Sequence, residues 1–330
     1  MSFKKAIQVF TKESKGFSEQ INSIAAQYHR PKLSVRMDTV WCRIAYGAPV
    51  SQYIGFEMYR MNRHERDRFV TIGRSNKLEP ILNHAPAEEK DILAKKQLFN
   101  KAYSKNIHRD WLYAPDSTDD EIRQFLTRNE VAIAKPTDGT RGNGVSKLDC
   151  GSALQEGQSF LDRARAQKLL LEEFVRQHPE LNAVNPSSLN TLRIATLRDK
   201  QGVVHVIGAS LRAGGAGSVV DNLHAGGVQY PVDVEPGLII RGGLTYDGKQ
   251  GIVFHPSTHT KMIGFQIPNW EQVIASVKEA AAIPPHLRYI GWDVAVTEDG
   301  CEFIEANLSQ GTNGMQQDGV GKYDIIKQYA

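Results

Sequence analysis

Oxygen-bearing side chains are concentrated in one short segment near the C-terminal end of the sequence. Residues 292–307 carry Asp293, a turn signal at 298–300, and then Glu305 and Asn307 two positions apart. If the turn closes a hairpin, Asp293 lies on one strand, and Glu305 and Asn307 project from one face of its partner. Two carboxylates and an amide oxygen are hard donors of the kind that Mg2+ prefers. We expect a magnesium site; the alternative is a surface hairpin with solvated polar residues.

The residues around these polar positions favour the metal site over the solvated hairpin. Val294, Val296, Phe303 and Ile304 look buried, so the polar residues interrupt strands that are otherwise apolar. We therefore take Asp293, Glu305 and Asn307 as candidate metal ligands.

A lysine followed by a glycine-rich loop forms a second group with chemical potential. Lys135 lies near the end of an apolar run, and residues 137–145 contain three glycines. Glycines let the backbone approach a ligand closely, so N–H groups can cradle phosphates while the lysine adds positive charge. The segment lacks the Gly-Lys-Ser/Thr of a Walker loop, and alone it fits a flexible hairpin equally well. Beside the acidic segment it indicates a phosphate loop, made of Gly139, Thr140, Arg141, Gly142, Gly144 and Val145.

Hydrophobic spacing predicts the elements that must position these residues. Apolar residues recur near helical spacing over residues 3–28 and 33–70, and a connection rich in small residues follows at 83–89. The N-terminal part, to about residue 90, is therefore predicted to be mainly helical.

Beyond residue 90 the pattern changes to short strands with few helices, which predicts an α+β fold. A helix is expected over residues 119–128, with Ser117 or Thr118 as its N-cap, and another over 268–282. Strands are expected at 131–136, 145–148, 169–175, 191–197, 203–211, 237–240, 289–296 and 301–305.

Length and composition indicate an ordinary globular protein of two or three packed units. The chain has 330 residues, of which 41% are hydrophobic and 23% charged. Residues 1–70 carry about +6 and the remainder about −3. This asymmetry fits an acidic substrate or solvated helix faces, and we expect no nucleic-acid partner.

The cysteines and the N-terminus point to the cytoplasm. Cys42, Cys150 and Cys301 are far apart and odd in number, which fits neither a disulfide framework nor a zinc site. The sequence shows neither the apolar stretch of a signal peptide nor that of a membrane span. We expect reduced thiols in a cytoplasmic protein.

The order of these motifs resembles that of the ATP-grasp superfamily. Lys135, the glycine-rich loop, residues 171–175 and the acidic set follow one another as they do there. The runs 190–194 and 212–227, together with His255-Pro and Gly291-Trp-Asp293, are similar to one branch, the sugar-transfer-associated, alpha-L-glutamate-ligase-like family. The resemblance implies two α+β subdomains that sandwich ATP, at 91–175 and 176–330, behind a helical unit at 1–90.

The resemblance also implies roles for individual residues. Lys96 and Lys135 would bind the ATP phosphates, although Lys95 fits the first position as well as Lys96 does. Glu172 would accept the adenine amino group, and the backbone of Glu173, Phe174 and Val175 would bind the rest of the base. Asp293, Glu305 and Asn307 would hold Mg2+, with two ions expected and Mn2+ as a substitute, and Arg193 would face the transferred phosphate. No ribose ligand is identified.

A second glycine-rich polar segment, residues 212–227, is expected to border the acceptor site. Arg212 would hold a substrate carboxylate or an acyl phosphate, and Asn222 would meet ATP or metal-bound water; a purely structural loop is the alternative. His224 and His255 are weaker candidates for substrate contacts, because a lone histidine is more often structural.

In ATP-grasp ligases a carboxylate attacks the γ-phosphate of ATP, and an amine captures the acyl phosphate. The resemblance therefore implies ligation of a small carboxylate and an amine, such as an amino acid, peptide or sugar acid, in the biosynthesis of cell-surface polysaccharide, peptides or natural products. A phosphotransferase with the same ATP site is the main alternative, and a regulatory module without turnover is a third. The oligomeric state is open.

Overall fold

The computed structural model of this chain describes residues 17–137, 144–215, 217, 226–245, 248–308 and 310–329. Part of the expected first helix and several candidate site residues lie outside these ranges, namely Gly139, Thr140, Arg141, Gly142 and Asn222, together with His224.

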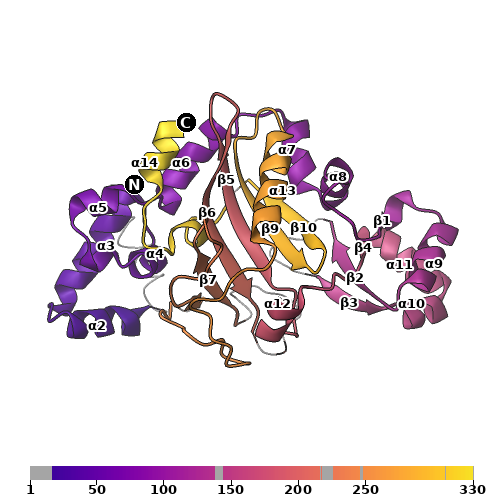
Figure 1. Ribbon diagram of the computed structural model, residues 1–330, viewed down its shortest axis with the longest axis horizontal. Helices are drawn as coiled ribbons and strands as arrows, with labels where there is room; N and C mark the ends of the chain where they lie inside the picture. Colours follow the sequence, from indigo (N-terminus) through magenta and orange to yellow (C-terminus); the bar gives the residue numbers. More distant parts are fainter. Residues whose placement is uncertain are drawn as a thin grey trace.

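Two separate antiparallel sheets form the centre and one end of the molecule (Figure 1). The small sheet has the order β1-β4-β2-β3 and consists of Trp111–Tyr113, Leu169–Glu173, Val131–Pro136 and Ser146–Asp149 in that order. The large sheet has the order β10-β9-β5-β6-β7-β8 and consists of Gly300–Asn307, Tyr289–Thr297, Thr191–Arg198, Val204–Ala213, Val228–Val232 and Leu244–Thr245. The predicted α+β class is confirmed.

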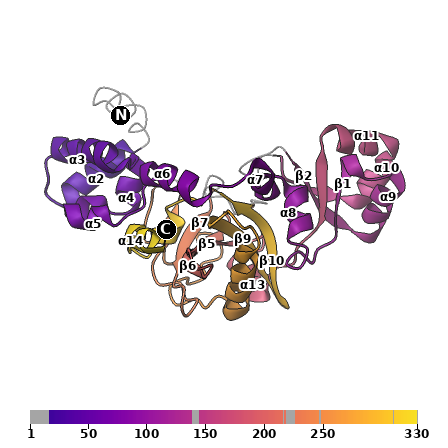
Figure 2. The same cartoon turned by 90° about the horizontal axis from the view of Figure 1, so that it is seen from above.

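The N-terminal part is helical, as predicted, and lies at the opposite end from the small sheet (Figure 2). Its amphipathic helices bury their apolar faces against one another, around Ile21, Val35, Tyr53 and Met58. The elements are α2 Ser18–Gln27, α3 Lys32–Tyr46, α4 Val50–Gly55, η1 Met58–Arg60, α5 Arg63–Asp67 and α6 Ile72–Leu82.

Two buried glutamines tie this helical part to the segment that follows β10. Gln52 of α4 donates to Thr312 Oγ1 at 2.5 Å and accepts from the Ile72 N–H at 2.9 Å. Gln316 accepts from the N–H of Val70 at 2.8 Å and donates to its carbonyl at 3.0 Å. Because both amides donate and accept, the helical part holds residues 312–316 in place.

One face of the large sheet carries the main hydrophobic core. Trp292 of β9 is fully buried there, and α13 (Trp270–Ala282) packs on this face through Val273 and Val277. Phe99 of α8 (Lys96–Ala102) belongs to the same core, as does Leu93 of α7 (Ala87–Ala94). The short α12 (Pro179–Val184) adds Leu181 and Val184.

The small sheet has its own core and its own helices. Ile122 and Phe125 of α9 (Asp119–Arg128) and Phe160 of α11 (Gln158–Ala166) pack against Leu171 of β4. Thr118 is the N-cap of α9 and forms a capping box with Glu121, which decides between the two predicted caps. The remaining elements are η2 Ala114–Asp116, α10 Cys150–Glu156, η4 Gly314–Gln316 and α14 Tyr323–Tyr329.

The strand predicted at 237–240 is wrong. Ile239 and Leu238 make only isolated bridges, to Val232 and Gln266. The chain turns at 233–237, where the Gly237 N–H donates to the Asp233 carbonyl and Gly237 adopts φ +72°. After this turn, residues 238–240 contact the end of β7 through the Val232–Ile239 bridge, without forming a strand.

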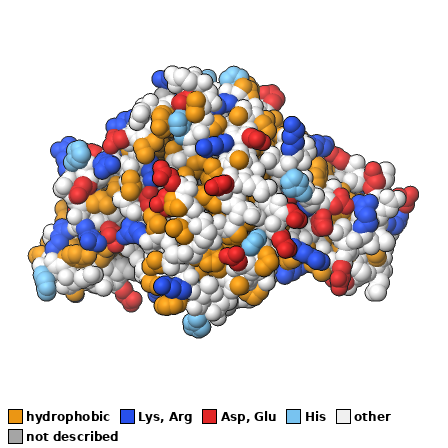
Figure 3. Space-filling model, viewed as in Figure 1, with side chains coloured by type: hydrophobic (Ala, Val, Ile, Leu, Met, Phe, Trp, Pro, Cys, Tyr) orange, Lys and Arg blue, Asp and Glu red, His pale blue; other side chains and the backbone are white. Residues whose placement is uncertain are grey.

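Charged side chains are interspersed over the face shown in Figure 3, with basic and acidic groups next to each other. All three cysteines are free and buried. Burial raises the pKa of the Cys42 thiol to about 12. Among the described residues, no helix is long and apolar enough to cross a bilayer.

We expect Thr118→Ala to lower the free energy of unfolding by about 1 kcal/mol, because the first turn of α9 loses its side-chain cap. Thr127→Ala on the same helix is the matched control, since Thr127 bonds only to the Arg123 carbonyl on an exposed face. Urea denaturation monitored by circular dichroism measures both. Equal losses in the two variants would contradict this role for Thr118.

Candidate active site at the junction of the two sheets

An irregularity in β10 decides which side chains face the site. The hairpin keeps one register from Gly300↔Thr297 to Phe303↔Val294, and Glu305 then pairs with Asp293. Ile304 is therefore an extra residue in β10, the arrangement of a β-bulge. With an unbroken register Ile304 would face Asp293, and Glu305 would turn to the core face.

The predicted metal ligands lie together on the face of the large sheet opposite the main core. Glu305 pairs with Asp293 across the β9–β10 ladder, and Asn307 follows two positions along. The Asn307 amide nitrogen donates to Glu305 Oε1 at 3.2 Å and to Asp293 Oδ2 at 3.4 Å. Ile304 is only partly buried at the irregularity, whereas Val294, Val296 and Phe303 are fully buried as predicted.

Two arginines from neighbouring strands hold Asp293. Arg193 of β5 donates from Nε to Oδ1 at 2.5 Å and from Nη2 to Oδ2 at 2.7 Å, and Arg212 of β6 donates to Oδ2 at 3.1 Å. The Arg193 guanidinium also donates to the Gln310 carbonyl at 2.8 Å. The structure thus brings the two predicted catalytic arginines and the predicted metal ligands into one cluster.

The pKa values of the two carboxyl groups in this cluster are shifted in opposite directions. Burial alone would raise the pKa of Asp293, but Arg193 and Arg212 hold it well below its usual range. Burial, and then the charge of Asp293, raise the pKa of Glu305. A divalent cation between the two groups would offset both effects on Glu305.

The donor set fits Mg2+ better than a softer metal. Two carboxylates and a carboxamide are oxygen donors, and a half-turn of the Asn307 amide presents its oxygen to the same point. Within the described part of the chain, no three His, Cys, Asp or Glu side chains come together as a metal site. The third ligand in this cluster is an amide, so the remaining positions of Mg2+ would be filled by water and phosphate oxygens.

A second buried cluster surrounds Glu172 at the end of β4. Its Oε1 accepts from Arg109 Nη2 at 2.6 Å and from Asn100 Nδ2 at 3.0 Å, while Lys135 of β2 forms an ion pair with Oε2. Burial alone would raise the pKa of Glu172, but the charges of Arg109 and Lys135 and two hydrogen bonds hold it well below its usual range. The carboxylate is therefore ionised and fixed.

The alternative phosphate lysines point to different places. Lys96, the first residue of α8, donates to the Pro136 carbonyl at 3.3 Å, one residue from Lys135. Lys95 is exposed and pairs with Asp91 of α7 at 2.7 Å. Lys96 is thus the one of the two that reaches the end of β2.

Glu173, the last residue of β4, and Phe174 after it were predicted to bind the adenine base through their backbone. The Glu173 N–H already donates to the Asp110 carbonyl at 2.8 Å, whereas Phe174 is exposed and Lys147 Nζ lies 4.9 Å from its ring centre.

At the end of the predicted phosphate loop, Gly144 adopts φ +78°. A Cβ there would lie 2.7 Å from Pro136, so only glycine fits. Val145 is partly buried beside it.

His255 is a structural residue. It is fully buried, its Nε2 lies 3.0 Å from the Gly214 carbonyl, and its Nδ1 lies 3.3 Å from Thr258 Oγ1. Burial lowers its pKa, which favours the neutral form of the ring. Both nitrogens have partners, which argues against the predicted substrate contact.

Sequence reasoning missed Arg109, Asn100 and Glu302. Arg109 donates from Nη1 to Glu302 Oε1 at 2.5 Å and to the Phe303 carbonyl at 2.7 Å, in addition to its contact with Glu172. These partners are 63 and 193 residues away in the chain, so no local sequence pattern indicates them. The only sequence signal is a charged residue just before the aromatic run at 111–113.

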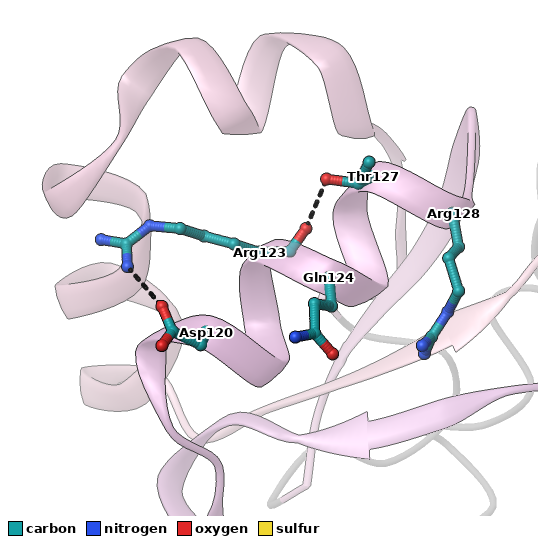
Figure 4. A pocket seen from close by; sticks show the side chains of 5 residues that line it. All are labelled: Asp120, Arg123, Gln124, Thr127 and Arg128. Atoms are coloured by element: carbon teal, nitrogen blue, oxygen red, sulfur yellow. Dashed lines mark hydrogen bonds and ion pairs between the residues drawn. The ribbon is translucent and has the colours of Figure 1, made fainter.

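A hollow of about 320 Å3 beside α9 is unrelated to either cluster (Figure 4). Its lining comes from one helix and consists of exposed polar side chains, namely Asp120, Arg123, Gln124, Thr127 and Arg128. It brings no groups together from different elements, so it is not a candidate site.

The matched family decides the identity of the fold. A model of the family described as sugar-transfer associated ATP-grasp matches residues 74–323. The chain belongs to this family. Sugar-transfer associated ATP-grasp proteins carry the ATP-grasp fold, so the chain has a fold that binds ATP and magnesium.

Solved structures similar to this ATP-grasp chain are distant. The ATP-grasp ligase PsnB, complexed with a phosphomimetic variant of a minimal precursor, Mg and ADP, is 14% identical with a TM-score of 0.43, covering 78% of this chain and 66% of that one. The L-amino acid ligase from Bacillus licheniformis is 13% identical with a TM-score of 0.45, covering 78% and 52%. D-alanyl-alanine synthetase A from Vibrio cholerae is 11% identical with a TM-score of 0.43, covering 73% and 66%. The match spans two thirds or less of each of these chains, and no curated protein matches the sequence.

Two single-residue deletions in β10 test how the ATP-grasp site is built. Deleting Ile304 restores a regular strand and leaves Glu305 opposite Asp293, so we expect Mn2+ binding to persist. Deleting Ala306 moves Asn307 to the core face, so we expect Mn2+ binding to weaken at least about tenfold. Electron paramagnetic resonance of bound Mn2+ measures both. Equal losses in the two deletions would contradict the assigned faces.

Proposed function

We propose that this protein is a carboxylate–amine ligase that forms an amide through an acyl phosphate. The observation that carries the proposal is the cluster of Asp293, Glu305 and Asn307 with Arg193 and Arg212. It combines oxygen donors for magnesium with two guanidinium groups on one sheet face. Such a pairing suits a reaction in which anionic groups must approach one another.

The proposed ATP site extends from the Glu172 cluster to the Asp293 cluster. Glu172 would accept the adenine amino group, and the backbone of Phe174 and Val175 would contact the base. The Glu173 N–H is used by Asp110, so it contributes no bond to the base. Lys96 and Lys135, at the end of β2, would neutralise the phosphates together with the loop that ends at Gly144 and Val145.

Charge neutralisation would supply most of the catalysis. A carboxylate that attacks the γ-phosphate meets negative charge on the phosphate oxygens, so the barrier falls when cations surround them. Mg2+ held by Asp293, Glu305 and Asn307 would supply electrostatic stabilisation of the phosphate oxygens. Arg193 would face the transferred group, and Arg212, which has one bond to Asp293, would hold the substrate carboxylate or the acyl phosphate.

We propose the two substrates as chemical classes. The carboxylate and the amine would be an amino acid, a peptide or a sugar acid, in the synthesis of cell-surface polysaccharide, peptides or natural products. The segment from Arg212 to residue 227 would border the acceptor, and Asn222 lies within it, outside the described residues.

The purified full-length protein with Mg-ATP and pools of amino acids, sugar acids and small peptides tests the ligase. We expect release of ADP and phosphate and a condensed product with the mass of the two substrates less one water, measured by mass spectrometry. Glu305→Ala should abolish the product, and Glu298→Ala, an exposed glutamate in the same hairpin, should not. A phosphorylated acceptor would replace the ligase by a kinase, and binding without turnover would replace it by a regulatory module.

Neighbouring lysines provide a second test of the ATP site. We expect Lys96→Ala to raise KM for ATP about tenfold or more, because a charged group near the phosphates is lost. Lys95→Ala should change KM less than about twofold, since Lys95 pairs with Asp91 on the surface. Steady-state ADP release measures both values. Equal effects, or a larger effect at Lys95, would exchange the two assignments.

A further inference from the structure

A short segment between α8 and β1 joins the two sheets by hydrogen bonds on both of its sides. On one side, the Phe303 N–H of β10 donates to the Asn106 carbonyl at 3.1 Å, and Glu302 accepts from the His108 N–H at 2.9 Å. On the other side, Asp110 exchanges two bonds with Glu173 of β4, at 2.8 and 3.0 Å. Residues 106–110 thus connect the edge strand of the large sheet to the second strand of the small sheet.

Arg109 lies in the middle of this segment and binds one carboxylate from each sheet. Its side chain is 3% exposed, and those of Glu172 and Glu302 are 3% and 4% exposed. The guanidinium fork places Nη2 on Glu172 and Nη1 on Glu302 and the Phe303 carbonyl. A lysine has one charged nitrogen on a flexible stem and cannot reproduce this planar fork.

The hydrogen bonds around Glu172 leave room for one more donor on one particular oxygen. A carboxylate oxygen accepts about two hydrogen bonds. Among the described residues, Oε1 accepts from Arg109 and Asn100, whereas Oε2 is paired with Lys135 alone. A further amino group can therefore donate to Oε2, and a carbonyl at the same point would face an ionised oxygen.

Both donors to Oε1 come from elements bound to the large sheet, namely α8 and the segment 106–110. Asn100 lies on α8 next to Phe99, which is part of the large sheet's core, and Arg109 is bonded to β10. The orientation of a small-sheet carboxylate is thus fixed from the large sheet. This arrangement differs from the metal cluster, where all contacts come from the large sheet and the segment after it.

We propose that Arg109 is a positioning residue that makes the purine selectivity of the ATP site depend on the docking of the two sheets. Arg109 occupies Oε1 of Glu172 and is held by Glu302, so Oε2 stays directed at the exocyclic amino group of adenine. The carbonyl of guanine would meet the same ionised oxygen, which disfavours binding of GTP. The inference rests on the proposed function, which places adenine at Glu172.

Binding of Mg-ADP and Mg-GDP to the full-length protein, measured by calorimetry, tests this role. We expect wild-type protein to prefer ADP, and Arg109→Lys to weaken ADP binding about tenfold and bring the ADP to GDP affinity ratio close to one. KM for ATP should rise with little change in kcat, because base recognition is the same in the ground and transition states. Arg128→Lys is the matched control, since Arg128 pairs with the neighbouring Asp110 on the surface.

The measured outcomes distinguish a positioning role for Arg109 from a purely structural one. A lower melting temperature of Arg109→Lys with unchanged ADP affinity and unchanged selectivity would overturn the inference and leave the proposed function intact. If Arg109→Lys does not fold, the double variant Arg109→Gln, Glu302→Gln is judged by the same two criteria, because it removes one charge of each sign. Wild-type protein that binds neither nucleotide would overturn the ATP site and this inference together.

Discussion

The candidate site depends on the register shift in β10 that accommodates Ile304. Side chains alternate between the two faces of a strand, so a slip of one position exchanges the core face for the site face. Ile304 provides that slip: Phe303 and Ala306 both enter the core, while Glu305 and Asn307 both reach Asp293. Because the turn at Gly300 fixes the start of the strand, the metal cluster and the hydrophobic core would otherwise compete for the same residues. The irregularity satisfies both.

Buried charge is the second constraint, and the two clusters meet it in the same way. An isolated carboxylate in a protein interior is strongly unfavourable, so it must be paired and hydrogen-bonded. Asp293 has a bidentate arginine and a second arginine, and Glu172 has an arginine, a lysine and an amide. In both clusters an arginine supplies the fixed geometry, while the other cation, Arg212 or Lys135, has fewer bonds and remains the group that a phosphate could engage. In the proposed mechanism, the cations that would neutralise the phosphates are therefore the same groups that pair the buried carboxylates.

Local patterns predicted much of this fold, and long-range pairing explains what they missed. The helix at 119–128 was predictable, and its N-cap was predicted to within one residue, because the cap and its partner are three residues apart. The convergence of Asp293, Glu305 and Asn307 was predicted from a regular hairpin, although a regular hairpin would have placed Ile304 opposite Asp293. The strand at 237–240 failed because a turn at Gly237 restricts it to isolated bridges. Arg109 could not be found, since its partners are distant in sequence and only the packing of two sheets brings them together.

The N-terminal helical part helps to position the candidate site, because it holds the segment that follows β10. The Gln310 carbonyl accepts from Arg193, which holds Asp293, so the position of this segment affects the Asp293 cluster. The same segment is fixed from the other side by two buried amides, because Gln52 of the helical part donates to Thr312 and Gln316 accepts from the Val70 N–H. A buried amide that loses a partner is costly, so this docking tolerates little displacement. The helical part therefore fixes one end of the site and residues 106–110 fix the other, and the large sheet between them carries the groups that both ends align.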